Sequence, residues 1–310
     1  MVRKVLISCS LLLAVACTDS AEPGSPCKAN LTCGGDLVCN FQAAEPICLA
    51  PDADEDGDGI TNDKDFCPAT AGGVNHDEDG DGQGDSCDTC PIEKWSVNST
   101  DKDGDGVSGI CDPDDNDKGD KILFFESFAS AATLNDWQLD DPAHFSIADD
   151  SLKATVTAAD VDAVAKYILP ISSDSVVAYT GFRVRDTAPA GVDGVSRDVS
   201  LEVLDPSPAA GGSRAKCGGT LTSSGGNLRL TTDMGETNEP MTGLFDSNVP
   251  YRILLQSAGA TARCAQTGGQ ASKSAQFPVG NVGKAVVSLS LRSLHADYDY
   301  VLVVQSPLLR

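Results

Sequence analysis

The chain has 310 residues, a net charge of -24 and only 5% aromatic residues. This charge excludes nucleic acid and anionic membrane surfaces as electrostatic partners and favours divalent cations. The 12 cysteines cluster in blocks, which indicates a disulfide framework formed in an oxidising compartment. A structural zinc site, the competing interpretation, needs paired Cys-x-x-Cys motifs, and the chain has one, at Cys87 and Cys90.

The N-terminal residues 1–16 have the pattern of an export signal. Arg3 and Lys4 precede an apolar run that is too short to remain in a bilayer as a membrane span. The run ends Leu-Ala-Val-Ala before Cys17, which resembles a bacterial lipobox. This resemblance implies that Cys17 is lipidated and anchors the protein to a membrane, with 17–26 as a tether. Ala14-Val15-Ala16 also suits ordinary signal cleavage, so the prediction is an exported outer-membrane or cell-surface lipoprotein, with a secreted protein as the alternative.

The segment 27–49 is predicted to be a small disulfide module. Its four cysteines are Cys27, Cys33, Cys39 and Cys48, and a piece this short needs disulfides because it cannot build a core. Two disulfides among four cysteines leave three possible pairings, which the sequence does not separate. A stapled spacer or a small binding module would both have this pattern.

The stretch 52–120 is the most acidic part of the chain. It holds 22 of the 46 Asp and Glu residues, and its carboxylates recur at alternate positions before a glycine. Such spacing lets a tightly curled loop aim successive carboxylates at one ion, while glycine permits the turn and the next carbonyl faces inward. This oxygen-rich pattern is typical of Ca²⁺, with Mg²⁺ as second choice.

Three such loops are present. The predicted metal ligands are Asp54, Asp56, Asp58, Ile60, Asn62 and Asp65 in the first loop, Asp77, Asp79, Asp81, Gln83, Asp85 and Asp88 in the second, and Asp101, Asp103, Asp105, Val107 and Asp112 in the third. In the third loop Gly109 replaces the ninth-position ligand, so we expect this site to use water or to bind more weakly. The acids of 114–120 form no complete fourth loop.

The motifs D-x-D-x-D-G-I-x-N-x-x-D-F-C-P at 54–68 and D-E-D-G-D-G-Q-G-D-S-C-D at 77–88 resemble thrombospondin type 3 repeats. EF-hands, by contrast, need flanking amphipathic helices. The resemblance implies that 50–120 wraps around calcium ions as a stalk. It also implies the disulfides Cys67–Cys87 and Cys90–Cys111. An acidic disordered linker is the alternative interpretation.

The remaining residues, 121–310, are predicted to be all β because short β-branched and aromatic runs alternate with Gly, Ser and Asp turns. The predicted strands are 122–128, 144–147, 152–157, 165–171, 176–185, 198–204, 218–222, 228–232, 251–256, 261–266, 285–292 and 298–305. This number of strands predicts a two-sheet β-sandwich or jelly roll. The opening F-E-S-F, Trp137 in the core and the closing A-D-Y-D-Y-V-L-V-V resemble laminin-G and concanavalin-A-like jelly rolls. Cys217 and Cys264 are expected to pair, tying adjacent strands.

The fold class is therefore mainly β: a C-terminal jelly roll preceded by a loop-rich calcium-binding stalk and a small disulfide module. We expect no enzyme, because Glu202 and Asp205 fall on opposite strand faces and His76, His144 and His295 form no catalytic grouping. Asp297 and Asp299 are expected to be solvated turn acids, with a calcium site at the sheet edge as the alternative.

The predicted function is a non-enzymatic calcium-binding envelope protein whose head binds a glycan or a surface protein. A jelly-roll glycan hydrolase and a purely structural spacer are the alternatives.

Overall fold

The structure of the protein is a computed structural model that describes 22–28, 32–41, 45–96, 99–156, 158, 161–186, 196–205, 213–242, 245–247, 249–268, 273–278 and 284–307. The predicted export signal and Cys17 lie outside the described residues. The chain forms two compact units, Met1–Gly72 and Gly73–Arg310. This division differs from the expected boundary at 120, because the second and third acidic loops belong to the same unit as the β-sandwich. None of the helices in the described part of the chain has the length and apolarity needed to cross a bilayer.

The first unit contains the disulfide module and the first acidic loop. Strand β1 (Val38–Asn40) pairs antiparallel with β2 (Ile47–Leu49). The disulfides are Cys27–Cys39 and Cys33–Cys48, which selects one of the three pairings that the sequence left open. They close short loops around a hairpin that could not support itself alone.

The second unit is built from strands and three short 3₁₀ helices. They are η1 (Gly109–Cys111), β3 (Lys121–Glu126), η2 (Ala131–Asp136), β4 (Gln138–Leu139), η3 (Pro142–His144), β5 (Phe145–Ala148), β6 (Ser151–Thr155), β7 (Asp162–Ser173), β8 (Ser175–Asp186), β9 (Arg197–Leu204), β10 (Arg214–Thr222), β11 (Gly225–Thr232), β12 (Gly235–Met241), β13 (Pro250–Ala258), β14 (Thr261–Gly268), β15 (Lys273–Pro278), β16 (Lys284–Arg292) and β17 (His295–Gln305).

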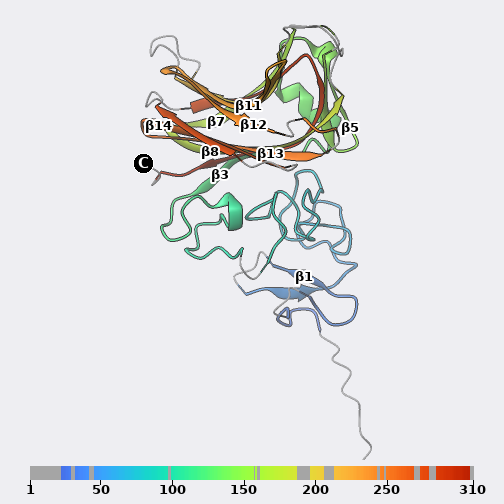
Figure 1. The fold of residues 1–310 in the computed structure, drawn as a ribbon. Helices are drawn as coiled ribbons and strands as arrows, with labels where there is room; N and C mark the ends of the chain where they lie inside the picture. The colour runs from blue at the N-terminus through green and yellow to red at the C-terminus, as the bar shows by residue number, and fades with distance from the viewer. Residues whose placement is uncertain are drawn as a thin grey trace, which may run out of the picture. The chain divides into compact units, whose positions relative to one another are not determined.

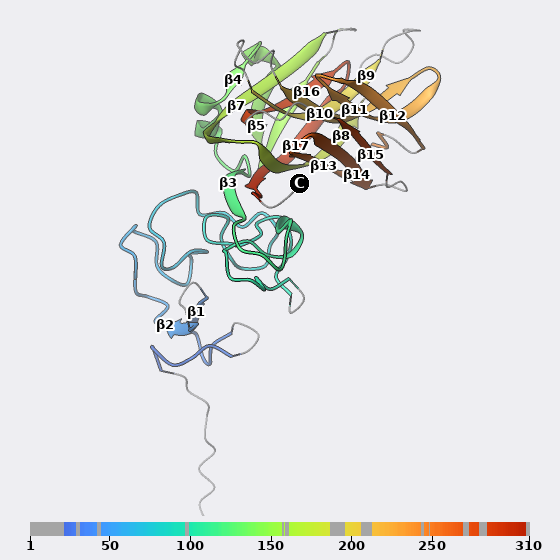
Figure 2. The ribbon, with the colours of Figure 1, turned by 90° about the vertical axis from the view of Figure 1, so that its left-hand side faces the viewer.

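These strands form a two-sheet jelly-roll sandwich, as predicted. The seven-stranded sheet has the order β12-β11-β10-β9-β16-β7-β4, and the eight-stranded sheet has the order β15-β14-β13-β8-β17-β6-β5, with β3 also paired to β17. Figure 1 shows the two layers, one with β7, β11 and β12 and the other with β8, β13 and β14. Strand β3 leads from the acidic repeats into the second of these sheets (Figure 2).

The main core lies between the two sheets. On β9 the alternate residues Val199, Leu201 and Val203 face this core, while the residues between them face away from it. Trp137 is buried among aromatic rings, which confirms its expected core position. The disulfide Cys217–Cys264 joins β10 to β14 and so crosses between the sheets. The expectation that it ties adjacent strands is therefore wrong.

A second apolar cluster covers the outer face of the eight-stranded sheet. Its members are Val177, Tyr179, Tyr300, Leu302 and Val304 from β8 and β17, together with Cys90, Ile92, Val107 and Cys111 from the acidic repeats. Strands β8 and β17 are thus buried on both faces, which explains their continuous apolar sequences. Gly181 makes room for this layer, since a Cβ there would lie 2.6 Å from the Tyr300 ring. The second and third loops therefore form a layer on the sandwich. They are not part of a separate stalk, as was expected.

All twelve predicted strands coincide with strands of the structure. Within the β-sandwich the sequence missed the two-residue strand β4 and the strands β12 and β15, and each of the three lies at an edge of its sheet. The strands β12 and β15 are long enough to have been expected. Both are polar and contain proline, as edge strands tolerate, so they lack the apolar alternation that identifies a strand.

Candidate functional site

The acidic loops share one local geometry, built by the first aspartate of each. In the first loop Asp54 accepts hydrogen bonds from the amides of Gly57 at 2.8 Å and Gly59 at 3.1 Å. Asp77 and Asp101 accept from the amides at the same two positions of their own loops. The sixth residue of each loop, Gly59, Gly82 or Gly106, has φ of +97°, +95° or +98°. Glycine is required there because other residues are strained in this backbone region.

Each loop gathers its first three aspartates. Carboxylate oxygens of Asp54, Asp56 and Asp58 all lie within 4.8 Å of one another, as do those of the matching triplets 77/79/81 and 101/103/105. Like charges this close repel one another, and a bound cation or protons would relieve this repulsion.

The strongest indication of a ligand comes from carboxylate oxygens that are buried and have no hydrogen-bond partner among the described residues. Six of them belong to the third and twelfth residues of the three loops: Asp56, Asp65, Asp79, Asp88, Asp103 and Asp112, in each case Oδ2. The other oxygen of the twelfth residue accepts a backbone amide, as in Asp88 with Cys90 at 2.8 Å. Because buried acceptors without partners are costly, their recurrence at the same positions fits a bound cation that ligates these oxygens.

Burial also raises the pKa of several of these carboxyl groups. The pKa of Asp79 and of Asp88 rises to about 7, first through burial and then through the negative charges of neighbouring aspartates of the loop. The pKa of Asp112 likewise rises to about 7, mainly through burial. Hard oxygen donors in this number suit calcium. The cluster of Cys27, Cys33 and Cys39 suits no metal, because all three cysteines are in disulfides.

The ninth-position residues Asn62 and Asp85, both predicted ligands, also make hydrogen bonds within their own loops. Asn62 Oδ1 accepts from the Glu55 amide at 3.4 Å, and Asp85 Oδ1 accepts from the Glu78 amide at 2.8 Å. Asp85 Oδ2 also contacts His76 Nδ1 at 2.9 Å. These contacts join the two ends of each loop. The amides of the seventh residues Ile60, Gln83 and Val107 bond to the fifth-position aspartates.

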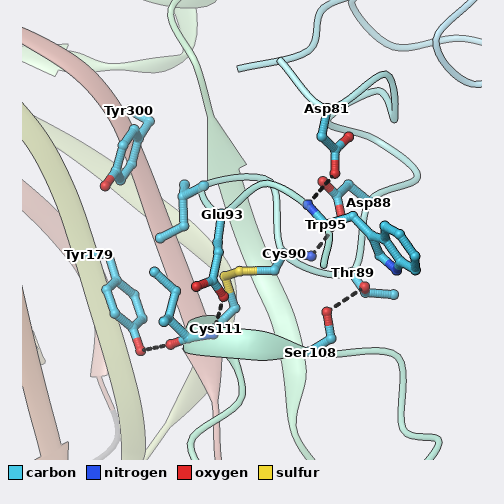
Figure 3. The surroundings of a disulfide bond; sticks show 12 residues. Asp81, Asp88, Thr89, Cys90, Glu93, Trp95, Ser108, Cys111, Tyr179 and Tyr300 are labelled. Carbon is cyan, nitrogen blue, oxygen red and sulfur yellow. Dashed lines mark hydrogen bonds between the residues drawn. A yellow bond between two sulfur atoms is a disulfide. The ribbon is translucent and has the colours of Figure 1, made fainter. Parts of the chain in front are cut away.

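The second and third loops are fastened to the sandwich through the surroundings of the Cys90–Cys111 disulfide (Figure 3). This is also the pair that the repeat resemblance implies. Tyr179 on β8 donates its hydroxyl to the Ile110 carbonyl at 2.7 Å, and Arg252 on β13 donates to the Ile92 carbonyl at 3.1 Å. Cys67 and Cys87 are each disulfide-bonded as well.

A cavity of about 330 Å³ lies where the second loop meets the eight-stranded sheet, lined by Glu78 and Asp79 of the loop and Arg183, Asp299 and Tyr300 of the sheet. Burial, followed by the charges of Asp299 and Asp85, raises the pKa of Glu78 to about 9.

Asp297 and Asp299 are neither solvated turn acids nor a calcium site, because basic side chains pair with both. Asp299 and Asp297 lie within β17, where Asp299 pairs with Arg183 at 2.7 Å and Asp297 pairs with Lys153 at 3.0 Å and with Arg185.

The outer face of the seven-stranded sheet differs from its counterpart because it is polar and open. A cavity of about 290 Å³ runs over β7, β9, β10, β11, β12 and β16. Its floor is a row of small residues in register, Ser290, Ser200 and Gly218. Charged residues border the row, among them Arg292, which pairs with Asp162, and Asp198, which accepts from Thr220. Such a surface offers many hydrogen bonds and no aromatic ring.

The residues considered for glycan hydrolysis do not come together. Glu202 lies on the outer side of β9, and Asp205 follows the end of that strand, so the two carboxylates do not share a strand face. His76 is occupied by Asp85, and His144 and His295 lie on separate elements.

No family model and no curated protein matches the chain. Solved structures of similar fold include the basic winged bean lectin with Tn-antigen (8% identity, 61% of this chain, 99% of that chain, TM-score 0.44). The CBM2 module of the Lactobacillus casei BL23 phage J-1 evolved Dit (9%, 60%, 96%, 0.42) and the xylan β-1,4-xylosidase of Bacillus halodurans C-125 (10%, 59%, 39%, 0.41) also resemble it. Every TM-score is below 0.5, so function has to follow from this chain's own residues.

Those residues define a class of protein: a two-sheet jelly-roll sandwich whose eight-stranded sheet is covered by the second and third acidic loops. Its disulfides are those of an exported protein.

Proposed function

We propose that the chain is an exported, non-enzymatic calcium-binding protein of the cell envelope. Calcium in the acidic loops stabilises the layer that covers the eight-stranded sheet, and the opposite sheet presents the surface that binds a partner. The observation that carries the calcium assignment is the set of buried, partnerless Oδ2 atoms at the third and twelfth position of every loop. Three separate loops repeat it, and an acidic spacer would have no reason to bury the same oxygens each time.

Equilibrium dialysis or titration calorimetry with CaCl₂ tests this assignment. The protein should bind about one ion per loop, with dissociation constants of about 0.1 to 1 mM, as in other extracellular calcium modules. Asp79→Asn and Asp88→Asn should each weaken one site. Glu236→Gln, on β12 at the edge of the other sheet, is the matched control and should leave binding unchanged. Absence of saturable binding would contradict the proposal.

The second part of the proposal concerns the polar cavity on the seven-stranded sheet. A cavity with a Ser/Gly floor and charged borders suits a hydroxyl-rich ligand such as a glycan, bound through hydrogen bonds instead of ring stacking. A glycan array tests this part. Lys216→Glu, on the border of the cavity, should abolish any binding, whereas Lys153→Gln, on the other sheet, should not. Polysaccharide cleavage that Glu202→Gln abolishes would instead favour the hydrolase.

The lipid anchor is a separate proposal that rests on the sequence around Cys17. Cys17→Ser should release the protein from the membrane fraction of the expressing cells into the soluble fraction. Unchanged membrane association of the variant would contradict the anchor, and a wild-type protein already in the soluble fraction would favour the secreted alternative.

A further inference from the structure

The third loop differs from the first two at its ninth position, where Gly109 has no side chain. The space that a side chain would fill is taken by Glu93, because a Cβ on Gly109 would collide with Glu93 Oε2. That oxygen accepts the Ile110 amide at 2.8 Å (Figure 3). Glu93 Oε2 is thus used by a backbone amide, and the third loop itself has one side-chain ligand fewer than each of the other two loops.

A buried acid from outside the loop changes this count. Asp120 is only 3% exposed, and its Oδ1 is buried with no hydrogen-bond partner among the described residues. Its own amide donates to Asp105 Oδ2 at 2.7 Å, and its Oδ2 accepts the Asp114 amide at 3.1 Å. Two hydrogen bonds therefore hold Asp120 against the third loop, and its Oδ1 has no hydrogen-bond partner among the described residues.

The Asp120 carboxylate lies close to other acids of the third loop. The carboxyl groups of Asp112 and Asp120 lie within hydrogen-bonding range of each other, and the charge of Asp120 also acts on Asp103. Asp112 Oδ2 is a second buried oxygen without a partner. Two carboxylates that face each other in this way are stabilised by a cation between them.

The second repeat provides an internal comparison. Lys94 donates to the Gly80 carbonyl at 3.2 Å, and Lys118, 24 residues later in the sequence, donates to the Gly104 carbonyl at 3.2 Å. Asp81 accepts the Trp95 amide as Asp105 accepts the Gly119 amide. The residue that corresponds to Asp120 is Ser96, whose amide bonds to Ser99 Oγ at 2.7 Å. The two repeats thus share their backbone contacts, and only the third loop has an acid at this place.

We propose that Asp120 is a direct calcium ligand of the third loop and supplies the oxygen that Gly109 lacks. This inference rests on the proposed calcium function. The ligands of this site are then Asp101, Asp103, Asp105, Asp112 and Asp120 with the Val107 carbonyl, a number that suits calcium. Because Lys121, the next residue, begins β3, an ion here also fixes the entry of the chain into the sandwich.

Calcium titration of the full chain tests this assignment, with Asp120→Asn, Asp120→Ser and Asp117→Asn as variants. Asp120→Ser copies the second repeat, and Asp117 is an exposed acid of the same segment. We expect both Asp120 variants to weaken one site at least about 10-fold, leaving the others unchanged, and Asp117→Asn to change affinity less than about 2-fold. Thermal unfolding in chelator, compared among the three variants, identifies any that fails to fold without metal.

The outcomes separate the two claims. No calcium binding by the wild-type chain would overturn both the proposed function and this inference. Normal binding by the wild type with unchanged binding in both Asp120 variants would overturn the inference alone. Equal weakening of every site would also overturn it, because Asp120 would then act on the fold and not on one ion. If Asp120→Asn does not fold in chelator, Asp120→Ser decides by the same criteria.

Discussion

The two outer faces of the sandwich are built on the same kind of antiparallel sheet and have opposite surfaces. On the eight-stranded sheet the outward residues of β8 and β17 are apolar, as in Val177, Tyr179 and Leu302, and the acidic repeats cover them. On the seven-stranded sheet the outward residues of β9 and β16 are polar, as in Ser200 and Ser290, and an open cavity lies over them. The outward-facing residues of a sheet, which alternate with its core residues, therefore decide whether that face is an open surface or an internal interface.

The largest expected effect tests the covered face. Leu302→Ala removes a fully buried side chain from the layer between β17 and the repeats, and should lower the free energy of unfolding by roughly 3 to 5 kcal/mol. Ser288→Ala is the matched control, because Ser288 is equally buried on a central strand of the other sheet and its hydroxyl has no partner among the described residues. It should change stability by less than about 0.5 kcal/mol. If urea denaturation gives equal losses in the free energy of unfolding for the two variants, the eight-stranded sheet is not covered in the way described.

Calcium removal should have the next largest effect. Two loops belong to the second unit, and each site held at about ten times its dissociation constant contributes about 1.4 kcal/mol, so chelation should cost about 3 kcal/mol. Because the loops pack on β8 and β17, scanning calorimetry should show the main sandwich transition moving down. A main transition that stays in place while a small separate transition moves would show that the loops do not stabilise the sheet.

A smaller effect is expected from the hydrogen bond between β8 and the third loop. Tyr179→Phe removes the bond to the Ile110 carbonyl and should cost about 1 kcal/mol in calcium. Tyr167→Phe, whose ring stacks on Phe124 at 3.9 Å in the sandwich, is the control and should cost less. If chelation leaves the Tyr179 effect unchanged in chemical denaturation, the bond does not depend on the calcium-bound loop.

The smallest effect concerns pH at the strand that connects the loops to the covered sheet. Burial raises the pKa of Glu126 above its ordinary value of 4.5, so the folded chain holds this proton more tightly than the unfolded chain. The contribution of this tighter proton binding to the free energy of unfolding is fully present below pH 4.5. It is lost as the pH rises through the raised pKa that Glu126 has in the folded chain. Glu126→Gln keeps the oxygen that accepts the Phe128 amide and loses the charge.

We therefore expect Glu126→Gln to be more stable than the wild type at pH 7, by less than about 1 kcal/mol because the carboxyl keeps some contact with water. The difference should disappear near pH 4. Urea denaturation between pH 4 and 8 measures it. A constant difference over this range would mean that ionisation of Glu126 is not the cause.

Much of the architecture followed from local patterns. The D-x-D-x-D-G spacing predicted tightly curled loops with glycine at the turn, and Gly59, Gly82 and Gly106 have the positive φ that such a turn requires. The hydrogen bonds that Asp54, Asp77 and Asp101 accept from the backbone were not predicted. The apolar alternation of the β-region predicted twelve strands and failed at three edge strands, the two-residue β4 and the polar β12 and β15. The sequence also contains a feature that could have predicted that the eight-stranded sheet is covered. The continuous run Tyr300–Val304 is too apolar for a strand with one wet face.

The sequence by itself determined what depends on neighbours along the chain: the turn of each acidic loop, the strand periods and the cysteine-rich blocks. Only the tertiary structure decided which cysteines meet, which sheet face the loops cover, and that Asp299 pairs with Arg183 instead of water. It also decided that Asp120 reaches the third loop. The physical reason is that turn and strand preferences are set by adjacent residues, whereas burial, pairing and the cost of an unpartnered charge depend on groups that folding brings together from distant positions.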